Sequence, residues 1–395
     1  MRDKYFVVNI GSDSKKYALY EGTERRFFAH FEKEAEAFIV TFETGGSKEK
    51  RMLSEKDYGN ALAGVLEEIK RSGAVTAPER EIRAVGFRVV APGSFFQKHR
   101  LVDSDFVKRL KSERGLAPLH AEPMLAELGR LDKLLPKIPV IAVSDSAFHA
   151  AMPPVASVYA IPHAIAEKFE IRRFGYHGIS FSSVVRKVKA TLGTMPSRVI
   201  MCHLGNGASV TAVKDGQSVD TSMGFTPLEG LVMGTRSGDI DPGALIELAK
   251  RLKLSPDKLE SFLYHECGLL GVSGESNDIR DLLKLEKEGD SRAALALDLF
   301  AYRIKKYIGA YAAALNGFDL VTFSGGIGER SFAMRERVMR GLDGLGLALD
   351  QSKNNAAESV DAFINQESSK DIAVIVTDEM GEIAAIAATF LKVQP

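Results

Sequence analysis

Residues 9–20, NIGSDSKKYALY, combine the end of an apolar strand, a polar turn that contains glycine, and a returning strand. Residues 203–214, HLGNGASVTAVK, repeat this pattern about half the chain length later. The identity between the two segments is low, so they indicate either an internal duplication or a chance similarity. A duplication would produce two similar halves, which together make a natural ligand site.

The rest of the chain reads as alternating strands and helices. Short apolar runs predict buried strands at 5–10, 138–143, 198–204 and 319–323. Apolar residues that recur every three or four positions predict helices over 54–72, with Ser54 as N-cap, and over 291–316 and 378–392. This mixture predicts an α/β architecture.

The composition limits the class of protein. The chain has 395 residues, which favours two or three domains. It is 45% apolar and 26% charged, an ordinary globular composition that excludes general disorder. Lys+Arg and Asp+Glu both number 52, so an overall basic field for nucleic acid is excluded, although a local patch stays open.

The cysteines and apolar runs indicate where the protein works. No run approaches the roughly 18 apolar residues of a membrane span. The first residues, MRDKYFVVNIGS, turn polar too soon for a signal peptide. Cys202 and Cys267 make no disulfide framework and no CxxC motif. These features predict a cytoplasmic protein without membrane partners.

Four polar turns that contain glycine stand out, and each is expected to end an apolar strand. Glycine lets the backbone approach a ligand closely, and successive N–H groups can cradle phosphate oxygens. None of the four matches the G-x-x-x-x-G-K-[ST] loop or a full G-x-G-x-x-G. Each alone is typical of an ordinary turn, but four together favour a phosphate site. They are GSDSKK (11–16), HLGNGAS (203–209), MGTRSGDIDPG (233–243) and SGGIGERS (324–331).

Charged residues lie in unusually apolar or glycine-rich surroundings. Arg88 is inside AVGFRVVA, Asp145 ends IPVIAVSD, and Arg236 and Asp239 share a loop flanked by glycines. A buried charge is costly unless it is paired. These residues therefore form either a structural Arg–Asp pair that links the two halves or an anion site, where Arg binds carboxylate or phosphate with two hydrogen bonds.

His177, within RRFGYHGIS, is either structural or functional. His203 and Asn206 would share one turn facing phosphate if the cradle hypothesis holds. The sequence contains no G-x-S-x-G motif, so acyl hydrolysis lacks support.

A metal site would use hard oxygen ligands, because no cluster has the spacing of a zinc site. Asn9, Asp145 and Glu379 provide the oxygens that Mg²⁺ prefers, and Mg²⁺ keeps most of its waters. Glu379, at the start of the predicted helix 378–392, has an alternative role in complementing the helix dipole.

Ten segments in this order resemble the acetokinase family, the acetate kinases of the acetate and sugar kinase/Hsp70/actin superfamily. The longest, FTPLEGLVMGTRSGDIDPG (225–243), is highly specific. The others are NIGSDSKK, GFRVV, APLH, SDSAFHAAMPP, GYHGIS, CHLGNGAS, GLLGVSGESNDIRD, GGIGERS and TDEMGEIA. The resemblance implies two ribonuclease-H-like (actin-like ATPase) domains flanking an active-site cleft. They would be an N-terminal domain, 1–148, and a nucleotide-binding C-terminal domain, 149–383, with 384–395 free to pack back onto the first.

The resemblance also implies roles for individual residues. Asp145 would be the catalytic aspartate, which we expect to orient the nucleophile or the metal shell because acetate is already ionised at pH 7. His177 and Arg236 would stabilise the transition state. Arg88 would bind the substrate, with Val90, Leu119, Tyr176 and Pro227 forming an apolar pocket for the acyl methyl. Asn9 and Glu379 would hold Mg²⁺, with Mn²⁺ as an alternative ion.

The remaining implied residues contact the nucleotide. Ser12, Ser14 and Lys16 match the first phosphate turn, and His203, Leu204, Gly205, Asn206 and Gly207 match the second phosphate loop. Asp278, Ile279 and Arg280 match a nucleotide-contacting segment, and Gly326, Ile327, Gly328, Glu329 and Arg330 match the adenosine loop.

The implied activity is reversible, Mg²⁺-dependent, in-line phosphoryl transfer from ATP to acetate, giving acetyl phosphate and ADP, by a homodimer. Three alternatives stay open: a kinase of propionate or another short-chain carboxylate, a kinase with a different phosphoryl donor, and a nucleotide-binding regulator without turnover. Departures from the family pattern bear on acyl and donor preference. They are Asp13, Phe87, Ala91, Pro92, Ala121, Tyr176, Phe181 and Arg330.

Overall fold

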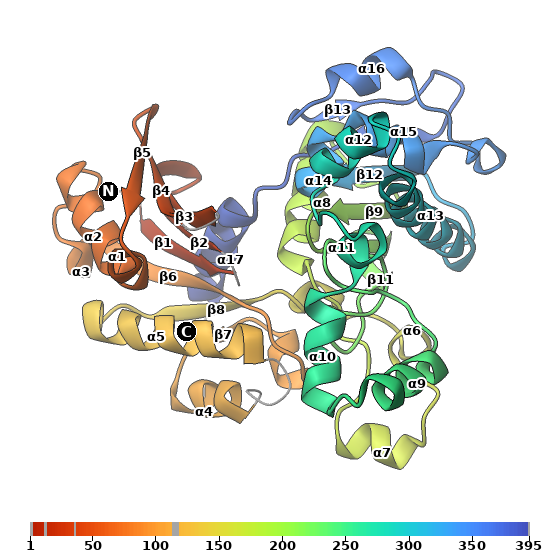
Figure 1. The fold of residues 1–395 in the computed structure, drawn as a ribbon. Helices are drawn as coiled ribbons and strands as arrows, with labels where there is room; N and C mark the ends of the chain where they lie inside the picture. The colour runs from red at the N-terminus through yellow and green to blue at the C-terminus, as the bar shows by residue number, and fades with distance from the viewer. Residues whose placement is uncertain (1–2, 12–13, 35–36, 113–117, 394–395) are drawn as a thin grey trace. The chain divides into compact units, whose positions relative to one another are not determined.

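The computed structural model describes residues 3–11, 14–34, 37–112 and 118–393. The chain divides into unit 1, Met1–Ala147 with Asp378–Pro395, and unit 2, Phe148–Thr377 (Figure 1). Residues 378–383 therefore lie in unit 1 and not in the C-terminal domain where the sequence placed them. The physical reason is that the last helix begins at Glu379 and packs as a whole on the sheet of unit 1. The expected cleft stays a prediction.

The sheet of unit 1 begins with the strand–turn–strand segment noted in the sequence. β1 pairs antiparallel with β2 and parallel with β6, and β6 pairs parallel with β8. The strand order is β5-β4-β3-β2-β1-β6-β8-β7. The strands are β1 Lys4–Ile10, β2 Ser14–Glu21, β3 Glu24–Glu34, β4 Ala37–Thr44, β5 Ser47–Leu53, β6 Ile82–Val89, β7 Arg100–Leu101 and β8 Val140–Ser144.

Helices cover both faces of this sheet. Alternate residues of β1 point to opposite faces, and Phe6 and Val8 belong to the same core as Leu62 of α2 and Leu128 of α5. α17 contacts β1, β6 and β8, and a side chain added at Gly86 would strike Ile383 of α17. The helices are α1 Glu55–Gly59, α2 Ala61–Arg71, α3 Pro78–Glu81, η1 Ser94–Gln97, α4 Ser104–Ser112, α5 Pro118–Leu134 and α17 Glu379–Val393.

The helix predicted over 54–72 is interrupted. Ser54 is the N-cap, and its hydroxyl accepts from the Asp57 N–H at 3.2 Å, as predicted. Asn60 then leaves the helical conformation, with φ −99° and ψ 22°, and separates α1 from α2. Asparagine favours such positions because its side chain competes for backbone hydrogen bonds.

The sheet of unit 2 repeats the topology of the first. β9 pairs antiparallel with β10 and parallel with β12, and β12 pairs parallel with β14. The order is β11-β10-β9-β12-β14-β13, so three antiparallel strands are followed by two parallel ones, as in β3-β2-β1-β6-β8. This match favours duplication over chance, and the α/β class is confirmed. The strands are β9 Arg198–Leu204, β10 Ala208–Lys214, β11 Gln217–Thr221, β12 Leu320–Ser324, β13 Ala362–Phe363 and β14 Asp371–Val374.

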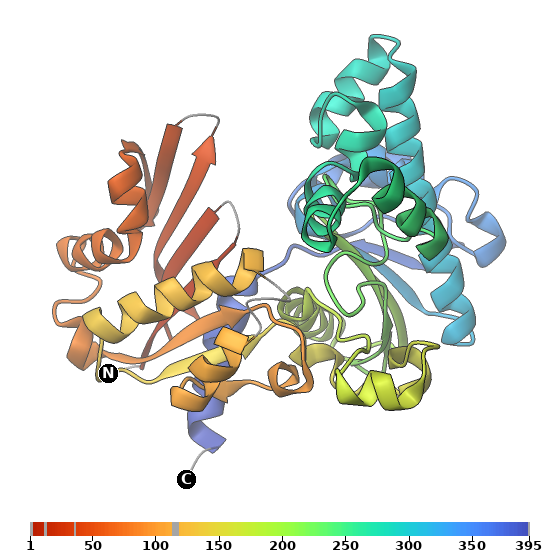
Figure 2. The ribbon, with the colours of Figure 1, turned by 60° about the horizontal axis from the view of Figure 1, so that its bottom comes forward.

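The longest helix of unit 2, α13, confirms the helix predicted from 291 onwards. It buries Leu297, Phe300, Ile304 and Ile308 and contacts β9 and β10 (Figure 2). The helices are η3 Ala147–His149, α6 Pro154–Ser157, α7 His163–Lys168, α8 Gly178–Leu192, α9 Pro242–Leu252, α10 Pro256–His265, α11 Gly268–Ser273, α12 Ile279–Lys287, α13 Ser291–Ala314, α14 Gly325–Arg330, α15 Phe332–Met339, η4 Asp343–Leu345 and α16 Gln351–Ala356.

Two of the four glycine turns differ from the prediction. The segment 324–331 is mostly the helix α14, which begins directly after β12 because Gly325 adopts φ +75°. The segment 233–243 does not follow a strand directly, since it begins inside the connection 222–241 between β11 and α9 and ends in the first turn of α9. Within the described ranges, no helix has the length and apolar character needed to cross a membrane.

Candidate active site

Four predicted residues gather at one edge of the unit 1 sheet. Asn9 lies near the carboxyl end of β1, Arg88 near that of β6, and Asp145 directly after β8. These strands are parallel neighbours, and the carboxyl ends of parallel strands are the usual place for a ligand site. Glu379, the first residue of α17, reaches the same place.

Hydrogen bonds join these four side chains. Arg88 donates from Nη1 to Asn9 Oδ1 at 3.2 Å and from Nη2 to Asp145 Oδ2 at 3.1 Å. Asn9 donates from Nδ2 to Glu379 Oε2 at 3.4 Å. Burial alone would lower the pKa of Arg88, but the charges of Asp145 and Glu379 outweigh it and raise that pKa above its ordinary value. The pair of Arg88 and Asp145 lies within unit 1, so it does not link the two halves.

One donor of Arg88 stays unsatisfied. Its Nε is buried and has no hydrogen-bond partner among the residues that the structure describes. A buried donor without a partner costs about 1–3 kcal/mol, so such groups are few in folded proteins. Arg88 can therefore still donate to an anionic oxygen, while Asp145 holds the guanidinium in place.

The donor set fits a magnesium ion held largely through water. The Glu379 carboxylate and the Asn9 amide oxygen are hard donors of the kind that Mg²⁺ prefers. In this structure Asn9 turns its Nδ2 towards Glu379, and its Oδ1 accepts from Arg88. Over the described ranges, no group of three or more His, Cys, Asp and Glu side chains is arranged to hold a metal ion directly. Ligation of Mg²⁺ through water by Asn9 and Glu379 is compatible with these donors and does not require a cluster of three ligands.

The structure places the other predicted residues of unit 1 as follows. Lys16 pairs with Asn9 across β1 and β2, so both point to the same face. Ser14 closes the preceding turn by accepting from the Gly11 N–H at 2.8 Å through its carbonyl. Val90 directly follows β6. Ser12 and the side chain of Leu119 lie outside the described residues.

Two histidines form the centre of the unit 2 cluster. His177 precedes α8 in a left-handed conformation, φ 58°, and its Nδ1 shares a hydrogen bond of 2.9 Å with Ser209 Oγ. His203 Nδ1 shares one of 2.7 Å with Ser180 Oγ. The two rings lie 4.3 Å apart between centroids. Ser180 and Ser209 are the orienting residues that sequence reasoning missed, although both lie in the segments GYHGIS and CHLGNGAS.

Gly207 brings the two proposed transition-state residues together. A Cβ at this position would lie 3.3 Å from His177 Nε2 and 3.5 Å from Arg236 Nη1. Both nitrogen atoms therefore border the backbone of the loop 203–207. A side chain at Gly207 would crowd the space next to these donors.

The predicted phosphate loop is supported by two other glycine segments. The Gly234 N–H donates to Asn206 O at 3.0 Å, and a Cβ at Gly234 would overlap the Asn206 side chain. A Cβ at Gly325 would lie 2.7 Å from Leu204 O. The three segments can pack this closely because glycine occupies the contact positions.

Several residues predicted to contact the nucleotide use their side chains to stabilise the loops. Ile279 is buried, and Asp278 caps α12 by accepting from the Arg280 N–H at 2.8 Å. Buried Glu329 accepts from the Gly325 N–H and the Thr377 N–H, both at 2.9 Å. The side chains of Ile279 and Glu329 therefore support the loops and are not exposed to a ligand.

Other side chains of these segments are accessible or support them. Arg280 and Arg330 are exposed, as is Gly326. Sequence reasoning missed Arg335, which is fully buried and donates to Gly328 O at 2.8 Å. It thereby holds the backbone of the predicted adenosine loop in place.

Two residues of the predicted acyl pocket belong to unit 2. Tyr176 is buried, and its hydroxyl donates to Phe225 O at 2.7 Å. Pro227 O accepts from Arg236 Nη1 at 3.2 Å. The hydroxyl by which Tyr176 departs from the family pattern is thus bonded to the backbone.

Two sheets of one topology, with arginine and histidine side chains and glycine loops near the strand ends, are typical of α/β phosphotransferases of the actin-like fold. Comparison with known proteins agrees with this class. The sequence profile of the acetokinase family matches residues 4–385, and the chain belongs to that family.

Individual relatives cover almost the whole chain. The acetate kinase of Clostridium botulinum is 41% identical over 384 residues, 95% of this chain and 96% of that protein. The crystal structure of Porphyromonas gingivalis acetate kinase is 35% identical over 98% of this chain and 100% of that chain, with a TM-score of 0.88. The crystal structure of a Francisella tularensis propionate kinase is 36% identical, over 97% of this chain and 98% of that chain, with a TM-score of 0.89. The chain is a carboxylate kinase.

Proposed function

We propose that this chain transfers a phosphoryl group reversibly between ATP and acetate, giving acetyl phosphate and ADP. The observation that carries the proposal is the Arg88 guanidinium, held by Asp145 and Asn9 with its Nε still free to donate. A cation fixed in this way suits a small carboxylate, which accepts two hydrogen bonds from arginine.

The chemistry demands charge neutralisation more than covalent catalysis. Acetate and the γ-phosphate are both anions, and in-line transfer requires that their repulsion be offset. Arg88 would bind the acetate, and Arg236 and His177 would donate to the phosphoryl oxygens as charge shifts in the transition state. Mg²⁺, held through water by Asn9 and Glu379, would neutralise phosphate charge; Mn²⁺ is an alternative ion.

Asp145 would act as a positioning group. Acetate is ionised at neutral pH, so the forward reaction requires no base. The buried Asp145 carboxylate instead orients Arg88 through the 3.1 Å hydrogen bond.

The glycine segments would bind the nucleotide. The loop 203–207 and the turn that contains Ser14 and Lys16 would contact phosphates, and the segments 278–280 and 326–330 would contact the adenosine. The close approach of Gly205, Gly234 and Gly325 to neighbouring backbone supports a cradle made of backbone groups.

Propionate is a second candidate substrate. The identity to a propionate kinase, 36%, is close to the 35% identity to an acetate kinase of known structure. One methylene changes preference by only about 1–3 kcal/mol, so we expect acetate to be preferred and propionate to be used more slowly.

We also propose that the protein acts as a homodimer in the cytoplasm. Large apolar side chains on and beside α6, α7 and α9 are exposed, and a second copy would cover them. They are Val155, Val158, Ile165, Phe169 and Ile246.

Trapping of acyl phosphate with hydroxylamine tests the function. The protein, ATP and Mg²⁺ are incubated with acetate, propionate or butyrate, beside Arg88→Ala and the control Arg83→Ala, an exposed arginine on the same strand. We expect most hydroxamate with acetate, lost only in Arg88→Ala. Absence of product with every acid, while ATP still binds, would overturn the proposal and favour another donor or a regulator.

A further inference from the structure

The segment 224–227, which leads to Pro227, is held on several sides although it lies in the connection between β11 and α9. Gly224 O accepts from the Phe174 N–H at 3.0 Å and from the Gly175 N–H at 3.3 Å. Pro227 O accepts from Arg236 at 3.2 Å. The backbone of this segment is thus fixed at both ends.

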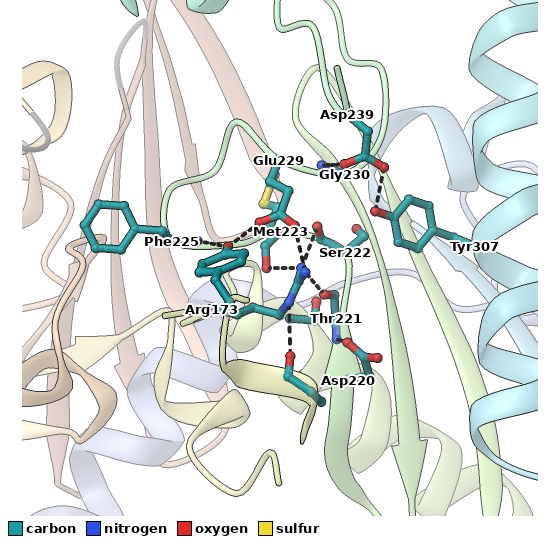
Figure 3. A network of polar contacts seen from close by, with 12 residues as sticks. Arg173, Asp220, Thr221, Ser222, Met223, Phe225, Glu229, Gly230, Asp239 and Tyr307 are labelled. Atoms are coloured by element: carbon teal, nitrogen blue, oxygen red, sulfur yellow. Dashed lines mark hydrogen bonds and ion pairs between the residues drawn. The ribbon is translucent and has the colours of Figure 1, made fainter. Parts of the chain in front are cut away.

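Between these ends, two tyrosine hydroxyls hold the backbone of Phe225. The Phe225 N–H donates to the Tyr159 hydroxyl at 2.9 Å, and Phe225 O accepts from the Tyr176 hydroxyl at 2.7 Å. In Figure 3, a dashed line joins Phe225 to the polar network around Glu229 and Arg173. Both polar backbone groups of one residue therefore depend on side-chain hydroxyls.

The Tyr159 hydroxyl is itself anchored. It donates to Glu229, whose other oxygen accepts from Arg173 Nη2 at 2.7 Å. Arg173 Nη1 donates to Thr221 O at 2.8 Å at the end of β11 (Figure 3). Burial raises the pKa of Tyr159 and the Glu229 carboxylate raises it further, so the hydroxyl stays protonated and able to donate.

The space behind the segment is filled. A Cβ at Gly224 would overlap both the Glu229 carboxylate and the Tyr159 hydroxyl. Tyr176, whose ring also belongs to the predicted acyl pocket, is 2% exposed. The backbone of residues 225–227 therefore cannot move without breaking hydrogen bonds.

We propose that the hydroxyls of Tyr159 and Tyr176 act as positioning groups for acyl selectivity, by keeping residues 225–227 rigid against a longer acyl chain. The inference rests on the proposed carboxylate kinase function and goes beyond it. A pocket discriminates against one extra methylene only if its lining does not relax around it. Tyr159 belongs to none of the predicted binding or catalytic residues.

The test removes one hydroxyl at a time. Tyr159→Phe and Tyr176→Phe keep the rings, and Tyr311→Phe is the matched control, because its buried hydroxyl donates to Asp220 at 3.4 Å instead. For each protein, kcat and KM are measured with acetate, propionate and ATP, together with Tm.

We expect the acetate-to-propionate ratio of kcat/KM to fall about three- to tenfold in both test variants. The change should arise mainly from a lower KM for propionate, with KM for ATP unchanged and the control ratio within twofold of wild type. A merely structural role would lower Tm and both kcat values without moving this ratio.

The outcomes separate the two proposals. If the wild type uses both acids and the ratio is unmoved in Tyr159→Phe and Tyr176→Phe, the selectivity inference is overturned and the proposed function stands. If the wild type uses neither acid, the proposed function fails and the inference fails with it. If one variant does not fold, the other decides.

Discussion

Arg88 Nη2 lies 3.1 Å from Asp145 Oδ2, and this ion pair joins the ends of two neighbouring parallel strands, β6 and β8. The Asp145 side chain is 2% exposed and that of Arg88 17%. Because a paired, buried carboxylate cannot easily shift, it fixes the direction in which the free Nε of Arg88 points.

Replacing this guanidinium with an ammonium should therefore abolish efficient use of acetate. Arg88→Lys keeps the charge but loses the planar fork and the Nε donor. We expect kcat/KM for acetate to fall about 100-fold or more, measured by steady-state kinetics. Arg83→Lys, at an exposed position near the start of the same strand, should change it less than twofold. Retention of the wild-type value in Arg88→Lys would refute the assigned role.

The hydrogen bond between Ser209 and His177 should matter for catalysis. Ser209→Ala removes the 2.9 Å partner of Nδ1, and with it one constraint on the ring and its tautomer. A hydrogen bond contributes about 1 kcal/mol, so kcat should drop about fivefold. Ser183→Ala is the control, because that buried hydroxyl donates to Ser180 O within α8. Equal effects of both substitutions on kcat would argue against an orienting role.

Replacing Glu329 should weaken binding of the nucleotide and leave binding of the carboxylic acid unchanged. Its Oε1 accepts from the Gly325 N–H, the Thr377 N–H and the Thr377 hydroxyl. Glu329→Ala leaves these donors unsatisfied, which should cost about 2 kcal/mol of folding free energy and raise KM for ATP several-fold.

Thermal unfolding and initial rates check this prediction. The exposed Glu367→Ala should change neither quantity. If only KM for acetate rose, the hydrogen bonds of Glu329 would not support the predicted adenosine loop, and the prediction would be wrong.

His99 should make stability depend on pH. Burial lowers the pKa of His99 from 6.5 to about 4, and its Nδ1 accepts from the Ser144 N–H at 3.1 Å, beside Asp145. The folded protein binds the proton less readily than the unfolded chain. The stabilisation is therefore complete above pH 6.5 and is lost as the pH falls towards 4, by at most about 3 kcal/mol.

His99→Gln preserves an acceptor for the Ser144 N–H but does not titrate. Denaturant unfolding of wild type and variant between pH 4 and 8 isolates the effect, since all other groups are shared. The free-energy difference between them should shift in favour of the variant as the pH falls. Parallel curves would contradict the prediction.

Local patterns explain why much of the fold could be predicted. The strand over 198–204 matches β9 residue for residue, because an apolar run bounded by polar residues has few alternatives. The helix from 291 is confirmed through 314, since its apolar period is long. The break at Asn60 was missed because Tyr58 and Leu62 keep the helical period across it.

The site was only partly predictable. Arg88, Asp145, Asn9 and Glu379 were identified as candidates, but the sequence left open an Arg–Asp pair between the halves. The strand register shows that the pair lies within unit 1. Arg88 of β6 pairs with Val143 of the adjacent parallel strand β8, two residues before Asp145. The assigned roles in catalysis and binding stay predictions for the kinetic tests above.

Residue order alone determined most of the elements, the repeated strand–turn–strand pattern and the family. These follow from local periodicity and from motifs that are contiguous in the chain. Tertiary structure alone decided which polar groups meet: Tyr159 with Phe225, Ser209 with His177, and Glu329 with Thr377. Such contacts depend on directions and distances between segments far apart in the chain, and no local pattern of residues encodes them.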